Sequence, residues 1–419
     1  MQDFNKLILL VGTNPLPNFV VAEYFLKNNH SLNEIIFLYS EENQDQRGTR
    51  EYAENLQKLL QGRHKNINLN FRSIHLSDIS SAKEIKRNLE ERLASHLENS
   101  HSIHLNYTGG TKVMATHIYR WIENYAKRNN ITASFSYLDA RKFQIVDDAQ
   151  GRITDDLRKE IGLNLEELIK LHGFERKNEP SDDDLNLFNN AIEKFKELID
   201  NGSIGTYLNN YNEYRQKIFT DEKGNLIRKT KELKSRIKEN IAQGVLLDVI
   251  KSMPDEYKLF NDDGSFKEPK TNKHTEKAIE FLDGKWLELY VYKVLTEKIS
   301  DKNIAKYINW EIKKSEWQGE NQKFELDIIL IKGYQLIGIS CTTSDRKFLC
   351  KSKGFEIFTR TRQIGGEEAR AVLITMLPDP KDLQGELEVD TGGKENILVL
   401  GANDLKEDVL VEKICYFIE

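Results

Sequence analysis

The sequence predicts an α/β protein with two α/β domains and a helical connector between them. Three observations support this prediction. Strand-like and helix-like segments alternate over residues 1–150, residues 151–280 are charged with helical periodicity, and a second α/β pattern occupies residues 281–419. A chain of 419 residues is long enough for each domain to bury its own core.

The first region consists of alternating strand and helix units. We expect strands at 6–12, 34–39, 67–76 and 102–107, helices at 19–27, 49–60, 82–97 and 112–127, and a closing hairpin from 131–138 and 142–147. Such alternation implies a parallel, doubly wound sheet. Ligands of these sheets bind outside the carboxyl ends of the strands, where the loops 12–18, 39–42 and 107–111 should converge.

The remaining elements are predicted from the same periodicities. Helices are expected at 163–171, 184–198 and 232–252, followed by an amphipathic helix at 285–295. In the last region we expect strands at 305–313, 325–331, 335–341, 370–375 and 397–400, with a helix at 353–364 and another at the end of the chain.

The overall composition excludes several classes of protein. Hydrophobic residues make up 39% and charged residues 31%, which is typical of a soluble globular chain and not of a disordered one. The formal net charge of −6 argues against a global basic field, so any nucleic-acid contact must be local. The three cysteines lack metal-ligand spacing, and the apolar run near the N-terminus is short. We therefore expect a cytoplasmic protein without a signal peptide or membrane contact.

The most informative stretch is Asn106-Tyr107-Thr108-Gly109-Gly110-Thr111-Lys112, between an expected strand and an expected helix. The glycines allow close approach of a ligand, the threonines provide hydroxyl groups, and the lysine provides a mobile positive charge. Together with the exposed N–H groups of the helix start, these features predict a phosphate-binding corner. The spacing differs from that of a Walker loop.

On this run and on the loop Thr13-Asn14-Pro15-Leu16-Pro17-Asn18, the first 150 residues resemble the CARF family of Rossmann-like domains. This family senses cyclic oligoadenylates in type III CRISPR defence. The resemblance implies a homodimer that holds a symmetric ring across its two-fold axis, with a cyclic tetra-adenylate favoured. The implied ligand-binding residues are Thr13, Asn14, Pro17, Asn18, Ser40, Asn106, Thr108, Gly109, Gly110, Thr111 and Lys112.

The last region resembles the restriction-endonuclease-like domain, of the PD-(D/E)xK type, found in CRISPR ancillary CARF nucleases. The resemblance rests on Gly284-Lys-Trp-Leu-Glu288, on Phe324-Glu-Leu-Asp327 and on Leu336-Ile-Gly-Ile-Ser-Cys-Thr342. It implies metal-assisted hydrolysis of a nucleic-acid substrate, with Asp327 and Glu288 holding Mg²⁺ or Mn²⁺.

One part of the nuclease pattern is missing. The slot for Glu-x-Lys on the second hairpin strand reads Ser340-Cys341-Thr342, so both the carboxylate and the lysine are absent. Three interpretations remain open. In the first, Lys347, Lys351 or Lys353 takes the role of the missing lysine, and Glu325 or Glu356 supplies the missing carboxylate. In the second, the domain is a nuclease with a lower rate or a narrower range of substrates. In the third, the domain has lost cleavage activity.

These observations leave three functional hypotheses. The first is a cyclic-oligoadenylate-activated, divalent-metal-dependent nuclease that cleaves DNA, RNA or both. The second is a catalytically degenerate sensor that signals through nucleic-acid or protein contacts. The third is an enzyme that degrades the ring at the dimer interface.

Overall fold

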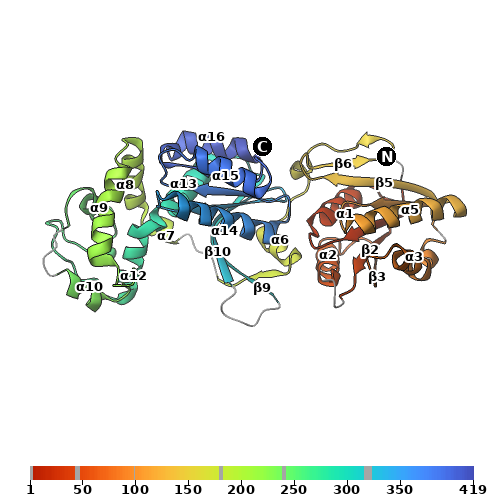
Figure 1. The fold of residues 1–419 in the computed structure, drawn as a ribbon, viewed down its shortest axis with the longest axis horizontal. Helices are drawn as coiled ribbons and strands as arrows, with labels where there is room; N and C mark the ends of the chain where they lie inside the picture. Colours follow the sequence, from red (N-terminus) through yellow and green to blue (C-terminus); the bar gives the residue numbers. More distant parts are fainter. Residues whose placement is uncertain (1–2, 43–47, 99, 179–182, 238–241, 316–322) are drawn as a thin grey trace.

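The computed structural model describes residues 3–42, 48–98, 100–178, 183–237, 242–315 and 323–419. Figure 1 shows an elongated molecule in which three regions follow one another along the long axis. The N-terminal sheet and its helices lie at one end, the C-terminal sheet lies in the middle, and helices from the central part of the sequence lie at the other end. No helix within the described ranges has an apolar stretch long enough to cross a bilayer.

The N-terminal sheet has, in the described residues, seven strands in the order β3-β2-β1-β4-β5-β6-β7. The first five strands of the sequence are parallel, and β6 and β7 extend the sheet in antiparallel fashion. The strands are β1 (Lys6–Val11), β2 (Glu34–Ser40), β3 (Asn70–Leu76), β4 (Ser102–Asn106), β5 (Thr132–Asp139), β6 (Gln144–Asp147) and β7 (Gly151–Arg152). This is the doubly wound sheet that the sequence predicts.

Helices cover both faces of this sheet. They are α1 (Leu16–Asn28), α2 (Arg50–Arg63), α3 (Ala82–Asn88), α4 (Ala94–Leu97) and α5 (Lys112–Asn129). Because helices lie on both sides, β1 and β2 are almost completely buried, which explains their continuous apolar sequences. The strand order reverses between β1 and β4, so the loops that follow these two strands border the crevice in which doubly wound folds bind ligands.

The C-terminal sheet has, over the same described ranges, six strands in the order β13-β12-β11-β10-β9-β8. Its strands are β8 (Phe174–Arg176), β9 (Ile304–Lys314), β10 (Lys323–Lys332), β11 (Gln335–Cys341), β12 (Arg370–Ile374) and β13 (Ile397–Leu400). The strands from β8 to β11 pair antiparallel, and β11 to β13 pair in parallel. The helices beside it are α13 (Trp286–Lys298), α14 (Lys347–Gly365), α15 (Lys381–Thr391) and α16 (Glu407–Ile418).

The central helices occupy residues 165–280 of the sequence. They are α6 (Leu165–Leu171), α7 (Asp183–Leu187), α8 (Asn189–Asp200), α9 (Ile204–Tyr214), α10 (Thr230–Arg236), α11 (Gly244–Ser252) and α12 (Asn272–Glu280). Although all of them follow the first sheet in sequence, Figure 1 shows α8, α9, α10 and α12 beyond the C-terminal sheet, not between the two sheets. The helical region therefore does not separate the two α/β halves in space.

The two sheets are joined by a shared hydrophobic core. One continuous cluster of buried side chains contains Phe19 beside β1, Leu168 on α6 and Phe324 on β10. Buried Arg158 adds polar contacts, because its guanidinium donates to Gln335 Oε1 at 2.7 Å and to the carbonyl oxygen of Ile418 at 2.9 Å. A second core joins the central helices to the opposite face of the C-terminal sheet, where Trp286 is fully buried.

Candidate functional site

The predicted phosphate corner is built by direct backbone contact between the ends of β1 and β4. A Cβ atom at Gly109 would lie 1.9 Å from the carbonyl oxygen of Leu10, and one at Gly12 would lie 3.0 Å from the backbone nitrogen of Gly110. Gly110 has a φ of +73°, which favours glycine. The Gly-Gly pair is therefore required for the two loops to lie against each other.

The predicted ligand residues of this corner fall into two groups. Thr13, Thr111 and Lys112 are exposed, and Thr108, Gly109 and Gly110 are half-buried beside them. Thr111 Oγ1 accepts a hydrogen bond from the backbone N–H of Met114 at 3.2 Å, so this threonine caps the 18-residue helix α5. The remaining first-turn N–H groups and the ammonium of Lys112 share one helix end, an arrangement that attracts anions.

The other group supports the loops from beneath. Pro17, Asn18, Ser40 and Asn106 are buried. Asn18 Nδ2 donates to the carbonyl oxygen of Leu10 at 3.0 Å, Ser40 Oγ lies 3.2 Å from Thr49 Oγ1, and Asn106 Oδ1 accepts from Thr108 Oγ1 at 2.7 Å. These side chains position the exposed groups, and their buried polar atoms face neighbouring loops.

Asn14 differs from the other residues of the first loop because its side chain faces the C-terminal half. Its Nδ2 donates to Glu368 Oε2 at 3.0 Å, and its Oδ1 lies 3.2 Å from His172 Nε2. The sequence places Asn14 on the ligand side of the loop, and the structure places its amide at the contact between the two halves.

The predicted nuclease residues surround a separate cavity of about 500 Å³. It lies between α13, the end of α12 and the edge of the β10–β11 hairpin, and Glu288, Glu325 and Thr342 are among its lining residues. Asp327 lies behind this lining and contacts the second hairpin strand. Its Oδ2 accepts hydrogen bonds from the backbone N–H of Cys341 at 2.8 Å and from Ser340 Oγ at 3.1 Å. The structure therefore brings Glu288, Glu325 and Asp327 to one place.

On β10, the regular alternation of side chains between the two faces of the sheet is interrupted at Asp327. On β10, Leu326 packs in the core shared by the two sheets, whereas Ile328 packs in the core formed with the central helices. On the partner strand, Asn309 adopts a φ of +58° between the positions that pair with these two residues. This left-handed residue marks the place where the carboxylates turn toward α13.

Lys285 supplies the lysine that the sequence pattern lacks. It precedes the first turn of α13, where its ammonium group contacts Glu288 Oε2 and Asn309 Oδ1 and lies 3.9 Å from Glu325 Oε1. Burial lowers the pKa of Lys285, but the carboxylates of Glu288, Glu325 and Asp327 outweigh burial and hold the pKa above its ordinary value. The ammonium group is therefore charged at neutral pH.

Crowding of carboxyl groups changes their protonation. Burial and the nearby charge of Asp327 raise the pKa of Glu288 to about 8, although Lys285 opposes this change. Burial also raises the pKa of Asp327, against the hydrogen bonds from Cys341 and Ser340, and that of Glu325. These carboxyl groups lie in an environment that an additional positive charge would stabilise.

The altered slot and the expected basic loop do not supply the missing groups. Ser340 donates to Asp327, and Thr342 Oγ1 accepts from the N–H of Ser344 at 3.3 Å. Lys347, predicted as a displaced catalytic lysine, pairs instead with Glu386 Oε1 on α15 at 2.7 Å. Lys351 contacts the same glutamate at 2.9 Å, and Lys353 pairs with Glu356 at 3.2 Å. The expectation that Lys347 belongs to the carboxylate site is thus corrected by its position between α14 and α15.

The cavity and the residues behind it carry carboxylate oxygens. Carboxylate oxygens from Glu288 and Asp327 are the ligands that Mg²⁺ and Mn²⁺ prefer. In the described part of the chain, however, no three side chains of His, Cys, Asp or Glu are gathered tightly enough to hold an ion. With the side chains in this arrangement, the ammonium group of Lys285 provides the positive charge.

Comparison with known proteins supports the fold of the N-terminal region. Residues 7–166 match the family model described as the Card1 CARF domain. The N-terminal domain of this chain is a CARF domain. No curated protein matches the chain by sequence.

The fold of the whole chain is similar to two solved structures. One is Can2 from Sulfobacillus thermosulfidooxidans in complex with cyclic tetra-adenylate, with 17% identity, a TM-score of 0.61 and coverage of 99% of each chain. The other is protein VC1899 from Vibrio cholerae, with 18% identity and a TM-score of 0.64, covering 99% of this chain and 98% of that one. The arrangement of the CARF domain and its C-terminal α/β partner is thus shared with these two structures.

Sequence reasoning missed two residues of the site, Lys285 and Asn309. A signal for Lys285 was present, because it precedes Glu288 by one helical turn and such pairs face each other. Asn309 gave no comparable signal, since its importance arises only from its backbone conformation opposite Asp327.

Proposed function

We propose that this chain is a cyclic-oligoadenylate-activated, divalent-metal-dependent nuclease of type III CRISPR defence that cleaves DNA, RNA or both. The observation that carries the proposal is the cavity in which Lys285 lies among Glu288, Glu325 and Asp327, in a chain that begins with a CARF domain. Carboxyl groups and an ammonium group in one cavity are suited to the hydrolysis of a phosphodiester.

The ring would bind at the corner formed by β1 and β4. The exposed hydroxyl groups of Thr13 and Thr111, the ammonium of Lys112 and the amide groups at the start of α5 are suited to phosphate and ribose oxygens. Binding of cyclic tetra-adenylate by Can2, a protein of the same fold, favours the tetra-adenylate as the ligand.

A homodimer fits both the ligand and the surface. A symmetric ring is best held by two copies of one site, related by a two-fold axis. Val113 and Tyr137 are exposed in the CARF domain, each at 37%, and Phe348 on α14 is 82% exposed. Covering such apolar side chains would favour association of two copies through both halves.

The residues in and behind the cavity would have different roles in cleavage. When bound, Mg²⁺ or Mn²⁺ would be held by Glu288 and Asp327 and would polarise the phosphate and a bound water. Lys285, charged at neutral pH, would neutralise the negative charge that develops on the phosphate. Because burial and the charge of Asp327 raise the pKa of Glu288 to about 8, this group would have to lose its proton before it could hold the metal ion. Asp327 is oriented by the N–H of Cys341.

The degenerate sensor is the second candidate. It is favoured by Ser340, which occupies the carboxylate position of the nuclease pattern and donates a hydrogen bond to Asp327. In this alternative the CARF domain binds the ring, and the C-terminal domain binds nucleic acid or protein without cleavage.

Replacement of Asp327 separates the two candidates. Asp327→Asn keeps the size of the side chain and an oxygen that can accept from Cys341. It should lower Mn²⁺-dependent cleavage at least about 100-fold and leave ring affinity unchanged. The matched control is Asp408→Asn, an exposed aspartate on α16, which should cleave normally. Equal cleavage by Asp327→Asn and wild type would move the active site elsewhere.

A further inference from the structure

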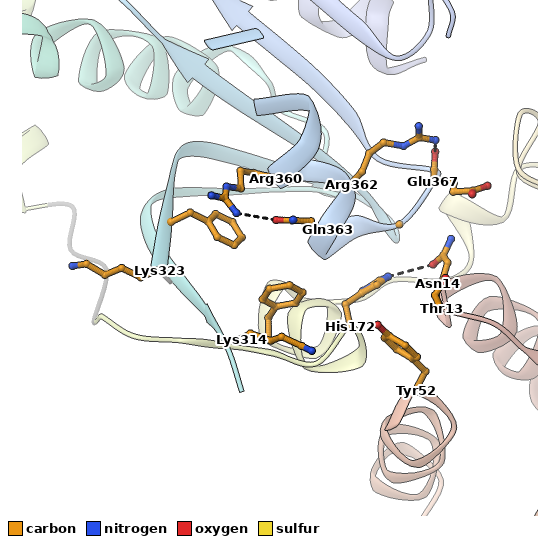
Figure 2. A pocket seen from close by; sticks show the side chains of 13 residues that line it. Thr13, Asn14, Tyr52, His172, Lys314, Lys323, Arg360, Arg362, Gln363 and Glu367 are labelled. Atoms are coloured by element: carbon orange, nitrogen blue, oxygen red, sulfur yellow. Dashed lines mark hydrogen bonds between the residues drawn. The ribbon is translucent and has the colours of Figure 1, made fainter. Parts of the chain in front are cut away.

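Apart from Thr13, the residues that line a further cavity have no role in the activity proposed above. This cavity has a volume of about 610 Å³ and lies where the CARF domain meets the C-terminal domain. The CARF domain contributes the loop after β1 and helix α2 to the walls of the cavity. The rest of the chain contributes the segment around β8 and the ends of β9, β10 and α14 (Figure 2). A cavity of this size is within the range that holds small organic ligands.

Positive charge gathers on the C-terminal wall of this interdomain cleft. Lys314 and Lys323 come from β9 and β10, and Arg360 and Arg362 come from α14. Figure 2 shows Arg360 above the aromatic rings and Arg362 farther along the same helix, where it extends toward Glu367. Among the cleft's lining residues Glu367 carries a negative charge, so the cations outnumber it.

The two arginines retain donors for a ligand. Arg360 Nη1 donates to Gln363 Oε1 at 3.2 Å, and Arg362 Nη2 donates to the backbone carbonyl oxygen of Glu367 at 3.2 Å. Both acceptors are neutral, although Arg362 also interacts electrostatically with the buried carboxyl group of Glu368. Lys323 is different because it pairs with Glu311 at 3.1 Å. The cleft therefore presents two guanidinium groups in the form that recognises phosphate.

Aromatic rings lie next to these cations. The guanidinium carbon of Arg360 is 4.7 Å from the centroid of the Phe324 ring, and Phe174 meets Phe324 edge-to-face at 6.1 Å. Tyr52 lines the wall contributed by the CARF domain. Flat apolar rings beside guanidinium groups form the combination on which nucleic-acid bases stack while their phosphates are neutralised.

The opposite wall carries neutral polar groups. Thr13 and Asn14 extend from the loop after β1, and His172 lies between them and the aromatic rings (Figure 2). Burial lowers the pKa of His172 to about 4, so it is neutral at physiological pH. The hydroxyl group of Thr13 can form hydrogen bonds with a sugar or a base without adding charge, whereas Asn14 and His172 bond to each other and to Glu368 and Leu168.

We propose that this interdomain cleft is a second nucleotide-binding site, which takes a nucleoside phosphate with its phosphate on Arg360 and Arg362 and its base beside Phe174 and Phe324. An acidic peptide would match the arginines but not the aromatic rings and polar wall together. The nucleoside phosphate is either a free nucleotide or one unit of a nucleic-acid strand. Because Thr13 and Asn14 belong to the loop of the ring corner, an occupant would touch both domains at once.

The test uses the full-length protein carrying Lys112→Ala, so that the ring corner does not compete for the probes. ATP is titrated by calorimetry, and a fluorescein-labelled single-stranded oligo(dA) of ten nucleotides is titrated by anisotropy, both at low salt. Binding of both probes, or of the oligonucleotide alone, would identify the ligand of the cleft as a nucleic-acid strand. Binding of ATP alone would identify it as a free nucleotide. Failure of both probes to bind overturns the proposal.

The double substitution Arg360→Gln and Arg362→Gln places the binding in the cleft. It should weaken the bound probe at least tenfold and reduce the salt dependence of binding. Lys351→Gln, on the same helix but paired with Glu386, serves as the control and should bind normally. Lys314→Gln provides an independent test if the double variant melts early. Unchanged affinity in folded double and Lys314 variants, or an equal loss in Lys351→Gln, overturns the proposal. Cleavage is not measured, so this result is independent of the nuclease assignment.

Discussion

The amide of Asn14 and the carboxyl group of Glu368 join the CARF domain to the C-terminal domain, with Asn14 Nδ2 donating to Glu368 Oε2 at 3.0 Å. Asn14 lies in the loop after β1, four residues before Asn18 in the ring corner, and Glu368 follows α14. Burial raises the pKa of Glu368, and the hydrogen bond from Asn14 opposes this rise. A change at the ring corner therefore has a direct path to the C-terminal sheet.

Asn14→Ala should weaken this connection. The substitution leaves the buried carboxyl group of Glu368 without this donor, which costs about 1–3 kcal/mol of stability. Ring affinity should change little, because the side chain of Asn14 faces away from the corner, but activation of cleavage by the ring should fall. Calorimetry of ring binding, urea unfolding and cleavage rates measure the three effects. Asn28→Ala, an exposed asparagine at the end of α1, is the control. Full activation in Asn14→Ala would assign the coupling to other contacts.

His172 makes the same junction sensitive to acid. Burial lowers its pKa to about 4 in the folded chain, against about 6.5 in the unfolded chain. The unfolded state therefore binds more protons between these two values, and stability present above pH 6.5 is lost as the pH falls toward 4. Between pH 7 and pH 5 the loss should be about 2 kcal/mol.

His172→Gln should remove this part of the pH dependence in urea unfolding. Glutamine retains groups that can bond to Asn14 and to the carbonyl oxygen of Leu168. The second buried histidine, His104, has a pKa lowered to about 3 by burial and contributes separately, so part of the slope should remain in the variant. An unchanged slope would mean that His172 takes up its proton in the folded state.

Lys285→Met tests the lysine that the structure adds to the site. Methionine fills a similar volume but leaves the buried carboxyl groups without the ammonium charge. Cleavage should fall about 100-fold, the scale of a lost positioning or acid–base group. Lys277→Met is the matched control, because Lys277 lines the same cavity and pairs with Asp184 away from the carboxyl cluster. Cleavage by Lys285→Met at the wild-type rate would exclude Lys285 from the reaction.

Lys112 and Thr111 should respond differently to replacement by alanine. Lys112 is exposed, so Lys112→Ala should leave stability within about 0.5 kcal/mol of wild type and weaken ring binding by roughly 1–3 kcal/mol. Thr111→Ala also removes the cap of α5 and should lower stability by about 1 kcal/mol. Calorimetry and thermal unfolding measure both, with Lys127→Ala at the end of α5 as the control. Equal ring affinity for Lys112→Ala and Lys127→Ala would remove Lys112 from the ring site.

The sequence predicts both sheets well because periodicity and burial act locally. The continuous apolar run of β1 and the Gly-Gly turn before α5 are direct consequences of helices on both faces and of the contact with Leu10. Glu288 and Asp327 lie close enough for the charge of Asp327 to raise the pKa of Glu288, as their positions on the helix and the hairpin imply.

Other features depend on contacts between distant segments. The sequence pattern predicts a displaced lysine beyond β11, but Lys347 forms an ion pair with Glu386 on α15. Lys285 contacts the carboxyl groups instead, next to Gly284, where the backbone leaves the helical conformation. The orientation of Asn14 depends on Glu368, 354 residues away in sequence. Periodicity carries no information about such pairings.

The most direct test of the central claim is a cleavage assay of the wild-type protein with Mn²⁺, with and without cyclic tetra- or hexa-adenylate, on single-stranded and supercoiled DNA and on RNA. We predict cleavage of at least one substrate only when both the ring and the metal are present, and its loss when EDTA is added. Tight binding of the ring without cleavage of any of these substrates would contradict the nuclease assignment and leave the degenerate sensor.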